Sequence, residues 1–115
     1  MITPLIFCTM SMFITCDPSM QAEVVKGEIV RQAEELGLDP TMPLKIAKAE
    51  SRYIIRAVNN KNKNGSNDKG VFQINSIHNL TDECRLNLYC NVKWSLEKMK
   101  KEGYGAWYSS EHKWK

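Results

Sequence analysis

Residues 50–75, ESRYIIRAVNNKNKNGSNDKGVFQIN, are the stretch from which the fold of the whole chain can be inferred. A carboxylate, Glu50, closes an apolar run with helical spacing. Residues 59–70 contain no apolar residue and are rich in Asn, Gly and Ser, which favour turns. A second carboxylate, Asp68, precedes the strand-like segment 71–74. The stretch therefore predicts a helix followed by a turn region and a small hairpin, with one acid at the end of the helix and one before the strand-like segment.

Glu50 shares a helical face with apolar side chains, because it lies four residues after Ile46 and three after Ala47. Loss of water at such a position disfavours the charged carboxylate and raises its pKa. A glutamic acid of this kind can remain protonated near neutral pH and donate a proton to a leaving oxygen. A glutamate at a helix end is otherwise a solvated surface residue, and helix position alone leaves both interpretations open.

Several short blocks in this region resemble the lysozyme-like muramidases, which include animal-type lysozymes and bacterial lytic transglycosylases of the soluble-lytic-transglycosylase (SLT) type. The matching residues are Glu50-Ser51, Ala57-Val58-Asn59, Asn64-Gly65-Ser66, Asp68 and Gly70-Val71-Phe72-Gln73-Ile74-Asn75-Ser76. The resemblance covers residues 44–76 well and the remainder loosely, and it is closest to the bacterial branch. It implies an α+β fold, mainly α-helical with a small antiparallel sheet. It also implies cleavage of the β-1,4 bond between N-acetylmuramic acid and N-acetylglucosamine in peptidoglycan, without a cofactor.

The same resemblance implies the roles of individual residues. Glu50 is expected to be the catalytic acid, and lysozyme is itself the standard example of a carboxyl group whose pKa is raised by burial. Asp68 matches the second carboxylate of animal-type lysozymes, which acts as nucleophile or stabilises the transition state. The alternative for Asp68 is a turn residue that hydrogen-bonds its own loop. Substrate binding is predicted for Ser51, Gln73, Asn75 and Tyr108, the last as a candidate because Trp107-Tyr108-Ser109 replaces the usual Tyr-Asn pair of the transglycosylases.

Three functions are compatible with these residues, with a lytic transglycosylase as the first. In that enzyme the hydroxyl of the muramic acid closes an anhydro ring, and Glu50 serves first as acid and then as base. The second is a lysozyme-type hydrolase, in which water completes the reaction with help from Asp68. The third is a non-catalytic glycan-binding module on the same fold, because fold does not fix function.

The N-terminal residues 1–15 are apolar and carry no charge. Their length suits the apolar core of a secretory signal and is too short to span a bilayer comfortably. Alternatives are a lipoprotein anchored through Cys16 and a retained N-terminal helix. We expect residues 1–22 to be an export segment and residues 23–115 to form the lysozyme-like domain. The predicted location is exported: secreted, periplasmic or associated with the cell envelope, with any membrane anchoring through the N-terminal segment.

Cys84 and Cys90 are the only cysteines left if the N-terminal segment is removed, and an isolated pair in an exported protein most simply forms one disulfide. Two cysteines with distant histidines are too few ligands for zinc. The segment 60–71 approaches the spacing of a calcium loop but lacks an acid at its first position and a Glu at its twelfth. No metal site is predicted.

The composition is that of one soluble domain of 115 residues, with a net charge of +3 and a pI near 8.7. That charge suits an anionic polymer such as cell wall, while the scattered lysines and the lack of a motif argue against nucleic acid. We expect a monomer acting on peptidoglycan strands. Helices are predicted over 17–37, from Thr41 to Glu50 and over 91–102, with Ser19 and Thr41 as N-caps and Gly37 and Gly103 as ends.

Overall fold

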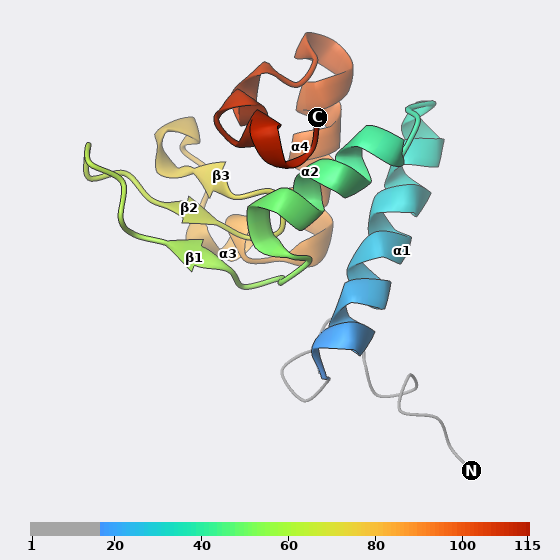
Figure 1. Ribbon diagram of the computed structural model, residues 1–115, viewed down its shortest axis with the longest axis horizontal. Coiled ribbons are helices and arrows are strands. Elements are labelled where there is room, and N and C mark those ends of the chain that lie inside the picture. The colour runs from blue at the N-terminus through green and yellow to red at the C-terminus, as the bar shows by residue number, and fades with distance from the viewer. Residues whose placement is uncertain (1–16) are drawn as a thin grey trace.

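The computed structural model describes residues 17–115, so Cys16 and the apolar segment before it lie outside the described residues. The predicted α+β class is confirmed, with helices packed beside one small sheet (Figure 1). The elements in chain order are the helix α1 Pro18–Leu36, the helix α2 Thr41–Ser51, the strands β1 Val58–Asn59, β2 Asp68–Lys69 and β3 Ile74–Asn75, the 3-10 helix η3 Ser76–His78, the helices α3 Asp82–Arg85 and α4 Leu88–Glu102, and the 3-10 helix η4 Gly105–Lys113.

Helix α1 has the predicted extent, but its N-cap differs from the prediction. Asp17 is the cap, and its carboxylate accepts a hydrogen bond of 3.0 Å from the backbone N–H of Met20. Ser19, the predicted cap, lies inside the helix because Pro18 occupies the first helical position, which proline favours. Gly37 ends the helix in the left-handed conformation, as predicted.

Helix α1 runs across the predicted boundary between residues 22 and 23. The side-chain oxygen of Gln21 accepts a hydrogen bond of 2.8 Å from the backbone N–H of Ile55. Residues 18–22 therefore belong to the folded domain in this structure. Where an export segment would end remains a prediction.

Helix α2 begins at Thr41, which was predicted to be its cap. The Thr41 N–H instead donates to the Asp39 carboxylate at 2.8 Å, so an acid just before the helix satisfies it. After Ser51 the chain reverses through two successive residues with positive φ, Arg52 at 56° and Tyr53 at 65°. This turn ends the helix directly after Glu50 and Ser51 and leads the chain into the sheet.

The sheet has the strand order β1-β2-β3 with both pairs antiparallel, which confirms the predicted hairpin. Asp68 lies opposite Asn59 on one side and Asn75 on the other. The predicted strand over residues 71–74 is wrong for its first part, since only Ile74 of that segment lies in a strand. The reason is the turn at Gly70, where φ is +88°.

The turn after Gly70 directs Val71 and Phe72 into the core, where both are fully buried. Asn91 of α4 holds this turn: it accepts a hydrogen bond of 3.0 Å from the Phe72 N–H and donates to the carbonyl oxygens of Lys69 and Arg85. The indole N–H of Trp107 donates to the Phe72 carbonyl at 2.8 Å. The strand-like composition of this segment therefore reflects burial in a turn.

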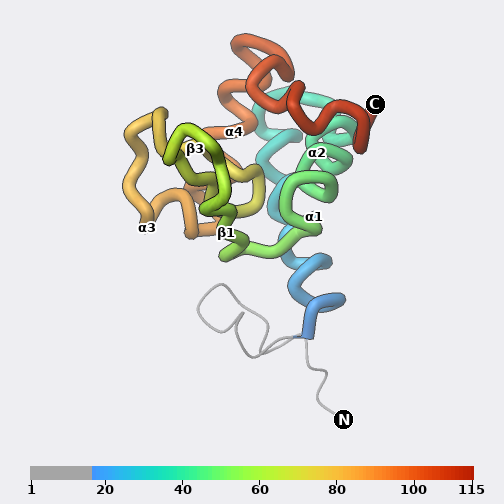
Figure 2. The backbone as a smooth tube through the Cα atoms, turned by 60° about the vertical axis from the view of Figure 1, so that its left-hand side comes forward, coloured from blue at the N-terminus to red at the C-terminus, as the bar shows by residue number. Residues whose placement is uncertain are grey.

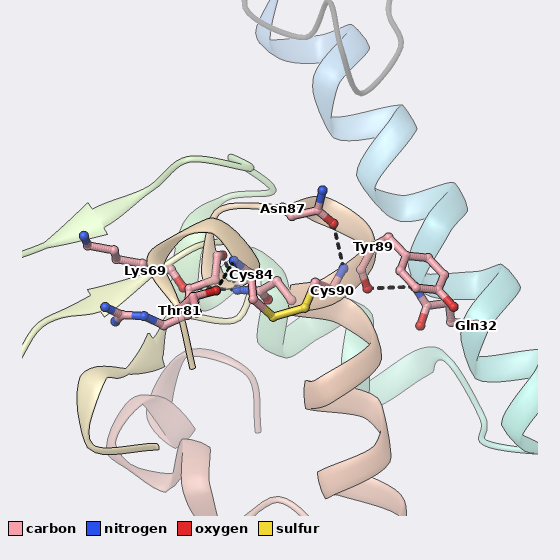
Figure 3. Close-up of a disulfide and its surroundings, with 9 residues drawn as sticks. Gln32, Lys69, Thr81, Cys84, Asn87, Tyr89 and Cys90 are labelled. Atoms are coloured by element: carbon pink, nitrogen blue, oxygen red, sulfur yellow. Dashed lines mark hydrogen bonds between the residues drawn. A yellow bond between two sulfur atoms is a disulfide. The ribbon is translucent and has the colours of Figure 1, made fainter. Parts of the chain in front are cut away.

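Helix α4 begins at Leu88, earlier than the predicted residue 91, because Asn87 caps it through a hydrogen bond of 2.8 Å from the Cys90 N–H. The predicted disulfide between Cys84 and Cys90 is confirmed and joins α3 to α4 (Figure 3). Beside it, the Gln32 side chain of α1 donates to the Tyr89 carbonyl at 3.2 Å. These contacts attach the start of α4 to α3 and α1.

The core joins the helices to the turn that precedes β3. Helix α1 packs against α4, and the C-terminal η4 packs against α2 (Figures 1 and 2). The buried side chains that form this core are Val25, Ile29, Ala33, Ile46, Ala47, Ile55, Val71, Phe72, Leu88, Val92, Leu96, Met99, Trp107 and Trp114. Within residues 17–115, no helix combines the length and the apolar composition of a membrane span.

Candidate active site

Glu50 lies in the last turn of α2, on the face that carries the fully buried Ile46 and Ala47, and is itself half-buried. Burial raises the pKa of its carboxyl group above the ordinary value, and the negative charge of Asp68 acts in the same direction. A hydrogen bond with Ser110 and the positive charge of Lys113 oppose this rise without cancelling it. Glu50 is thus a carboxyl group that holds its proton to a higher pH than a solvated one.

Ser110 of η4 is the one direct side-chain partner of Glu50 within the described residues, and its hydroxyl lies against one carboxylate oxygen. The hydroxyl is fixed by two further groups, the Trp107 carbonyl at 3.1 Å and the Trp114 indole N–H, which donates to it at 3.1 Å. Two buried tryptophans thereby position the group that contacts the acid. Sequence reasoning missed Ser110, because nothing in the tail marks a residue that meets Glu50 only through tertiary packing.

Asp68 in β2 is held by carboxamide groups on both of its oxygens. Asn59 and Asn62 donate to one oxygen at 3.1 and 3.0 Å, and Asn75 donates to the other at 2.9 Å. Strand pairing places Asn59 and Asn75 on either side of Asp68. The loop-stabilising role expected as the alternative for Asp68 is therefore present in the structure, together with a position in the cleft described below.

Gln73 and Asn75 are also engaged with the protein. The Gln73 amide nitrogen donates to the carbonyl oxygens of Ala57 and Gly70, at 3.1 and 3.0 Å. The Asn75 amide oxygen accepts from the Ile77 N–H at 3.0 Å and caps η3. Within residues 17–115, no group donates to the side-chain amide oxygen of Gln73. Gln73 is therefore more available to a ligand than Asn75.

A cleft of about 860 Å³ joins these residues, within the range of pockets that hold small ligands. Its walls come from the sheet and its loop, the end of α2, η3, α4 and η4. The lining residues are Glu50, Asn62, Lys63, Asn64, Ser66, Asp68, Gln73, Ile74, Asn75, Ile77, His78, Trp94, Lys98, Glu102, Gly105, Ala106, Trp107 and Ser109. The structure thus brings together four of the predicted site residues, namely the two acids and the two amides.

Ser51 and Tyr108, also predicted to bind substrate, do not line this cleft. Ser51 is buried, and its hydroxyl donates to the Ala47 carbonyl one turn earlier in the same helix. Tyr108 is exposed and stacks on Trp114, with ring centroids 6.4 Å apart and planes 27° apart. Both side chains are directed by local packing, so adjacency in sequence to cleft residues did not place them in the cleft.

The cleft lining also includes an aromatic pair that was not among the predicted site residues. His78 of η3 lies against Trp94 of α4, with ring centroids 4.8 Å apart. The Lys98 ammonium lies over the same Trp94 ring, 5.5 Å from its centroid. Burial and the Lys98 charge lower the pKa of His78, so its imidazole favours the neutral form.

The described residues include no cluster of three or more His, Cys, Asp or Glu side chains with the geometry to hold a metal ion. In the segment 60–71, whose spacing approaches that of a calcium loop, and at Asn59 just before it, the Asn59 and Asn62 amide nitrogens donate to Asp68. Amide nitrogens are donors and do not coordinate cations, so these groups are arranged for hydrogen bonding within the loop.

Comparisons with known proteins bear on the fold. No family model matches the sequence, and no curated protein matches it either. Among solved structures, the crystal structure of recombinant wild-type canine milk lysozyme in its apo form is similar, with a TM-score of 0.60 and 22% sequence identity over 80% of this chain and 84% of that chain. Similarity at that identity establishes the lysozyme-like α+β fold predicted from residues 44–76.

Proposed function

We propose that this protein is a muramidase that cleaves the β-1,4 bond between N-acetylmuramic acid and N-acetylglucosamine in peptidoglycan, and that it acts as a lytic transglycosylase. The observation that carries the proposal is Glu50 itself: a half-buried carboxyl group with a raised pKa, at the wall of a cleft of about 860 Å³. The lysozyme-like fold and the sequence resemblance around residues 44–76 support the choice of substrate.

Glu50 acts first as an acid in this proposal. Its proton passes to the glycosidic oxygen while the bond from that oxygen to the anomeric carbon of the muramic acid breaks, and the sugar acquires oxocarbenium character. The leaving chain departs with a free hydroxyl group. Glu50, now a carboxylate, accepts the proton of the muramic acid's 6-hydroxyl as that oxygen bonds to the anomeric carbon. The product carries a 1,6-anhydro ring, and Glu50 is again protonated.

The environment of Asp68 suits a structural role. Three carboxamides donate to its two oxygens, so the carboxylate already holds the loop together. A reaction that draws its nucleophile from the substrate needs only the one acid. Asp68 then stabilises the cleft wall and contributes its charge to the raised pKa of Glu50.

The second candidate is a lysozyme-type hydrolase with the same acid. It is favoured by the likeness to canine milk lysozyme and by the position of Asp68 in the cleft lining, where a carboxylate can stabilise positive charge on the sugar. In this case water adds to the anomeric carbon and the product has an ordinary reducing end.

The cleft offers groups suited to a glycan. Trp94 supplies an aromatic surface and His78 a neutral imidazole. The side-chain amide oxygen of Gln73 can accept a hydrogen bond from a sugar hydroxyl or an N-acetyl N–H. No cofactor is needed for the proposed reaction. The Cys84–Cys90 disulfide supports an exported protein, because disulfides persist in oxidising compartments.

The test compares wild type with Glu50→Gln and with Glu102→Gln on purified peptidoglycan. Glu102 also lines the cleft, so it is a matched change of one carboxylate to an amide. We expect Glu50→Gln to lower the rate of release of soluble fragments by at least about a hundredfold, while sedimentation shows that it still binds the insoluble polymer. Glu102→Gln should retain most of the rate. If wild type and Glu50→Gln bound equally and released nothing, the protein would be a glycan-binding module instead of an enzyme.

A further inference from the structure

A second hollow, of about 670 Å³, lies along α2 and is separate in its lining from the cleft. We call it the α2 basic hollow, and its lining residues are Lys45, Lys48, Ala49, Arg52, Tyr53, Lys113, Trp114 and Lys115. Five of these carry basic side chains, and none carries an acidic one. In a chain whose net charge is only +3, such a gathering of one sign creates a local positive field.

Helical spacing and the packing of the tail together build this hollow. Lys45 and Lys48 are three residues apart and share one face of α2, and Arg52 follows as the residue that caps its C-terminal end. The C-terminal end of the chain lies beside α2 and brings Lys113 and Lys115 to the same place (Figures 1 and 2). The dipole of α2 favours cations at its C-terminal end, which accounts for Lys48 and Arg52 but for none of the others.

Three of these cations, Lys45, Lys48 and Arg52, form no ion pair with any residue that the structure describes. Elsewhere in the described chain, lysines such as Lys93 and Lys98 pair with a glutamate on the next turn at 2.8 and 3.0 Å. Among the described residues, one cation of the α2 basic hollow makes such a pair, Lys115 with Glu111 at 3.6 Å, and the charge of Lys113 also acts on Glu50. Like charges held together without counterions repel one another, so a bound anion would relieve that repulsion.

Aromatic side chains give the hollow a rigid wall. The Tyr53 hydroxyl donates to the Leu44 carbonyl at 3.0 Å, which fixes the half-buried ring. The buried Trp114 is fixed by its hydrogen bond to Ser110. A concave site with a ring on one wall and guanidinium and ammonium groups on the others suits a compact group that combines a sugar ring with a phosphate. A flat membrane surface would not enter such a hollow.

We propose that the α2 basic hollow binds phosphorylated sugar units of an anionic glycan, with Lys48 and Arg52 on the phosphate and Tyr53 against the sugar. Arg52 offers a planar fork that matches phosphate bidentately, and Lys113 and Lys115 complete the charge from the opposite side. The site would retain the protein on a phosphate-bearing polymer while the cleft remains free. Because it concerns binding alone, the proposal does not depend on Glu50 or on cleavage.

The test is an NMR titration of the folded protein, with backbone amide shifts as the readout and N-acetylglucosamine 1-phosphate as the probe. We expect saturable shifts centred on residues 48–53 and 113–115. N-acetylglucosamine without the phosphate should leave these residues unshifted, and inorganic phosphate should bind at least about tenfold more weakly than the sugar phosphate. Equal binding of inorganic phosphate and the sugar phosphate would overturn the part of the proposal that concerns the sugar.

Two double variants, each removing two positive charges, test the site: Lys48→Gln/Arg52→Gln on α2 and Lys113→Gln/Lys115→Gln on the tail. Each double variant should bind N-acetylglucosamine 1-phosphate at least about tenfold more weakly than wild type does. The control Lys61→Gln/Lys101→Gln removes the same charge from residues outside the hollow and should bind as wild type does. An equal loss in the control would mean non-specific attraction and overturn the proposal. The proposal would also be overturned if wild type bound phosphatidylglycerol vesicles but not the sugar phosphate, and the Lys48→Gln/Arg52→Gln variant lost the vesicle binding.

Discussion

Glu50 is the residue on which competing electrostatic influences converge. Burial against the apolar face of α2 and the charge of Asp68 raise the pKa of its carboxyl group, while Ser110 and Lys113 lower it. Together these influences keep Glu50 protonated to a higher pH than a solvated glutamic acid. Ser110 and Lys113 still stabilise the carboxylate once the proton has been transferred. A group that must give and then recover a proton requires both properties.

Replacing Ser110 by alanine should raise the pKa of Glu50 further, because the variant loses a hydrogen bond that stabilises the charged form. Only protonated Glu50 can donate, so activity falls as the pH rises through this pKa. The alkaline limb of the profile of kcat/KM against pH should therefore move to higher pH in Ser110→Ala. Ser109→Ala, a neighbouring change in the cleft lining, should leave the limb in place. An unchanged limb in Ser110→Ala would contradict the assigned contact.

The raised pKa of Glu50 also predicts how stability depends on pH, independently of activity. The folded state holds this proton more tightly than the unfolded state, so its contribution to stability is fully present below the unfolded pKa. That contribution is lost as the pH rises from the ordinary value of 4.5 through the folded pKa.

The Glu50→Gln variant lacks this titration and serves as the reference. Urea denaturation at a series of pH values should show wild type losing stability relative to Glu50→Gln across that window, by about 1.4 kcal/mol for each unit by which the folded pKa is raised. The relative stability should stop changing once the pH is above the folded pKa. A difference that stays constant from pH 4 to pH 8 would show that Glu50 is not desolvated.

Part of the candidate site was predictable from the sequence. The spacing of Glu50 from Ile46 and Ala47 predicted its desolvation, because helical periodicity is local. Ser110 was not predictable, because its contact with Glu50 depends on how the tail packs against α2. Ser51 was placed in the site because Glu50-Ser51 resembles the lysozyme-like muramidases, but its hydroxyl satisfies the helix backbone instead.

Among the elements, the turn between β2 and β3 depends most closely on single residues. Gly70 has a φ of +88°, and a Cβ added there would lie 2.0 Å from the Arg85 carbonyl oxygen and 2.1 Å from the Asn91 amide nitrogen. Both neighbours are fixed by hydrogen bonds at the start of α4. The position of the sheet relative to α4 therefore depends on the absence of a side chain at this residue.

Gly70→Ala should lower the free energy of unfolding by about 3 kcal/mol or more, since it combines a forbidden backbone conformation with a clash that rigid neighbours cannot relieve. Gly65→Ala is the matched control, because Gly65 has a similar φ of +83° with open space around it. Its cost should be about 1 kcal/mol, from the backbone alone. Urea denaturation of both variants gives the comparison, and equal costs would contradict the tight approach of α4 to the turn.

The disulfide between α3 and α4 closes a short loop (Figure 3). Chain-entropy arguments give about 2 kcal/mol of stabilisation for a loop of this length. The double variant Cys84→Ser/Cys90→Ser should lose roughly that amount in urea denaturation. Reduction of wild type should reproduce the loss, whereas a reductant should leave the double variant unchanged. If oxidised wild type and the variant had the same free energy of unfolding, the disulfide would constrain neither the folded nor the unfolded state.

The three long helices and the hairpin were predictable from local patterns. The short helix α3, the 3-10 helices η3 and η4 and several boundaries were not. Residues 71–73 have strand-like composition, yet they form a buried turn because Gly70 and Asn91 fix the backbone there. Asn87 caps α4 so that the helix starts at Leu88, which is buried on the same face as Val92 and Leu96 but was not included in the predicted helix. Local periodicity shows where a helix is amphipathic, and the cap decides where it starts.

For the whole molecule, α2 contributes to two hollows, the cleft through Glu50 and the α2 basic hollow through Lys45, Lys48 and Ala49. The α+β class followed from residues 44–76, because that short stretch contains both the helix end and the hairpin. The sequence did not predict that the C-terminal tail completes both hollows. That arrangement depends on packing between residues about sixty positions apart, such as Glu50 and Ser110. The proposed arrangement places glycan cleavage and polymer retention on two faces of one helix.

The measurement that tests the proposed function most directly is mass spectrometry of the soluble products released from purified peptidoglycan by wild type and by Glu50→Gln. We predict muropeptides that carry a 1,6-anhydro ring with wild type and their absence with the variant. Products with ordinary reducing ends would contradict the transglycosylase and assign Asp68 to the mechanism of a hydrolase. Equal product release by wild type and Glu50→Gln would contradict the central claim that Glu50 is the catalytic acid.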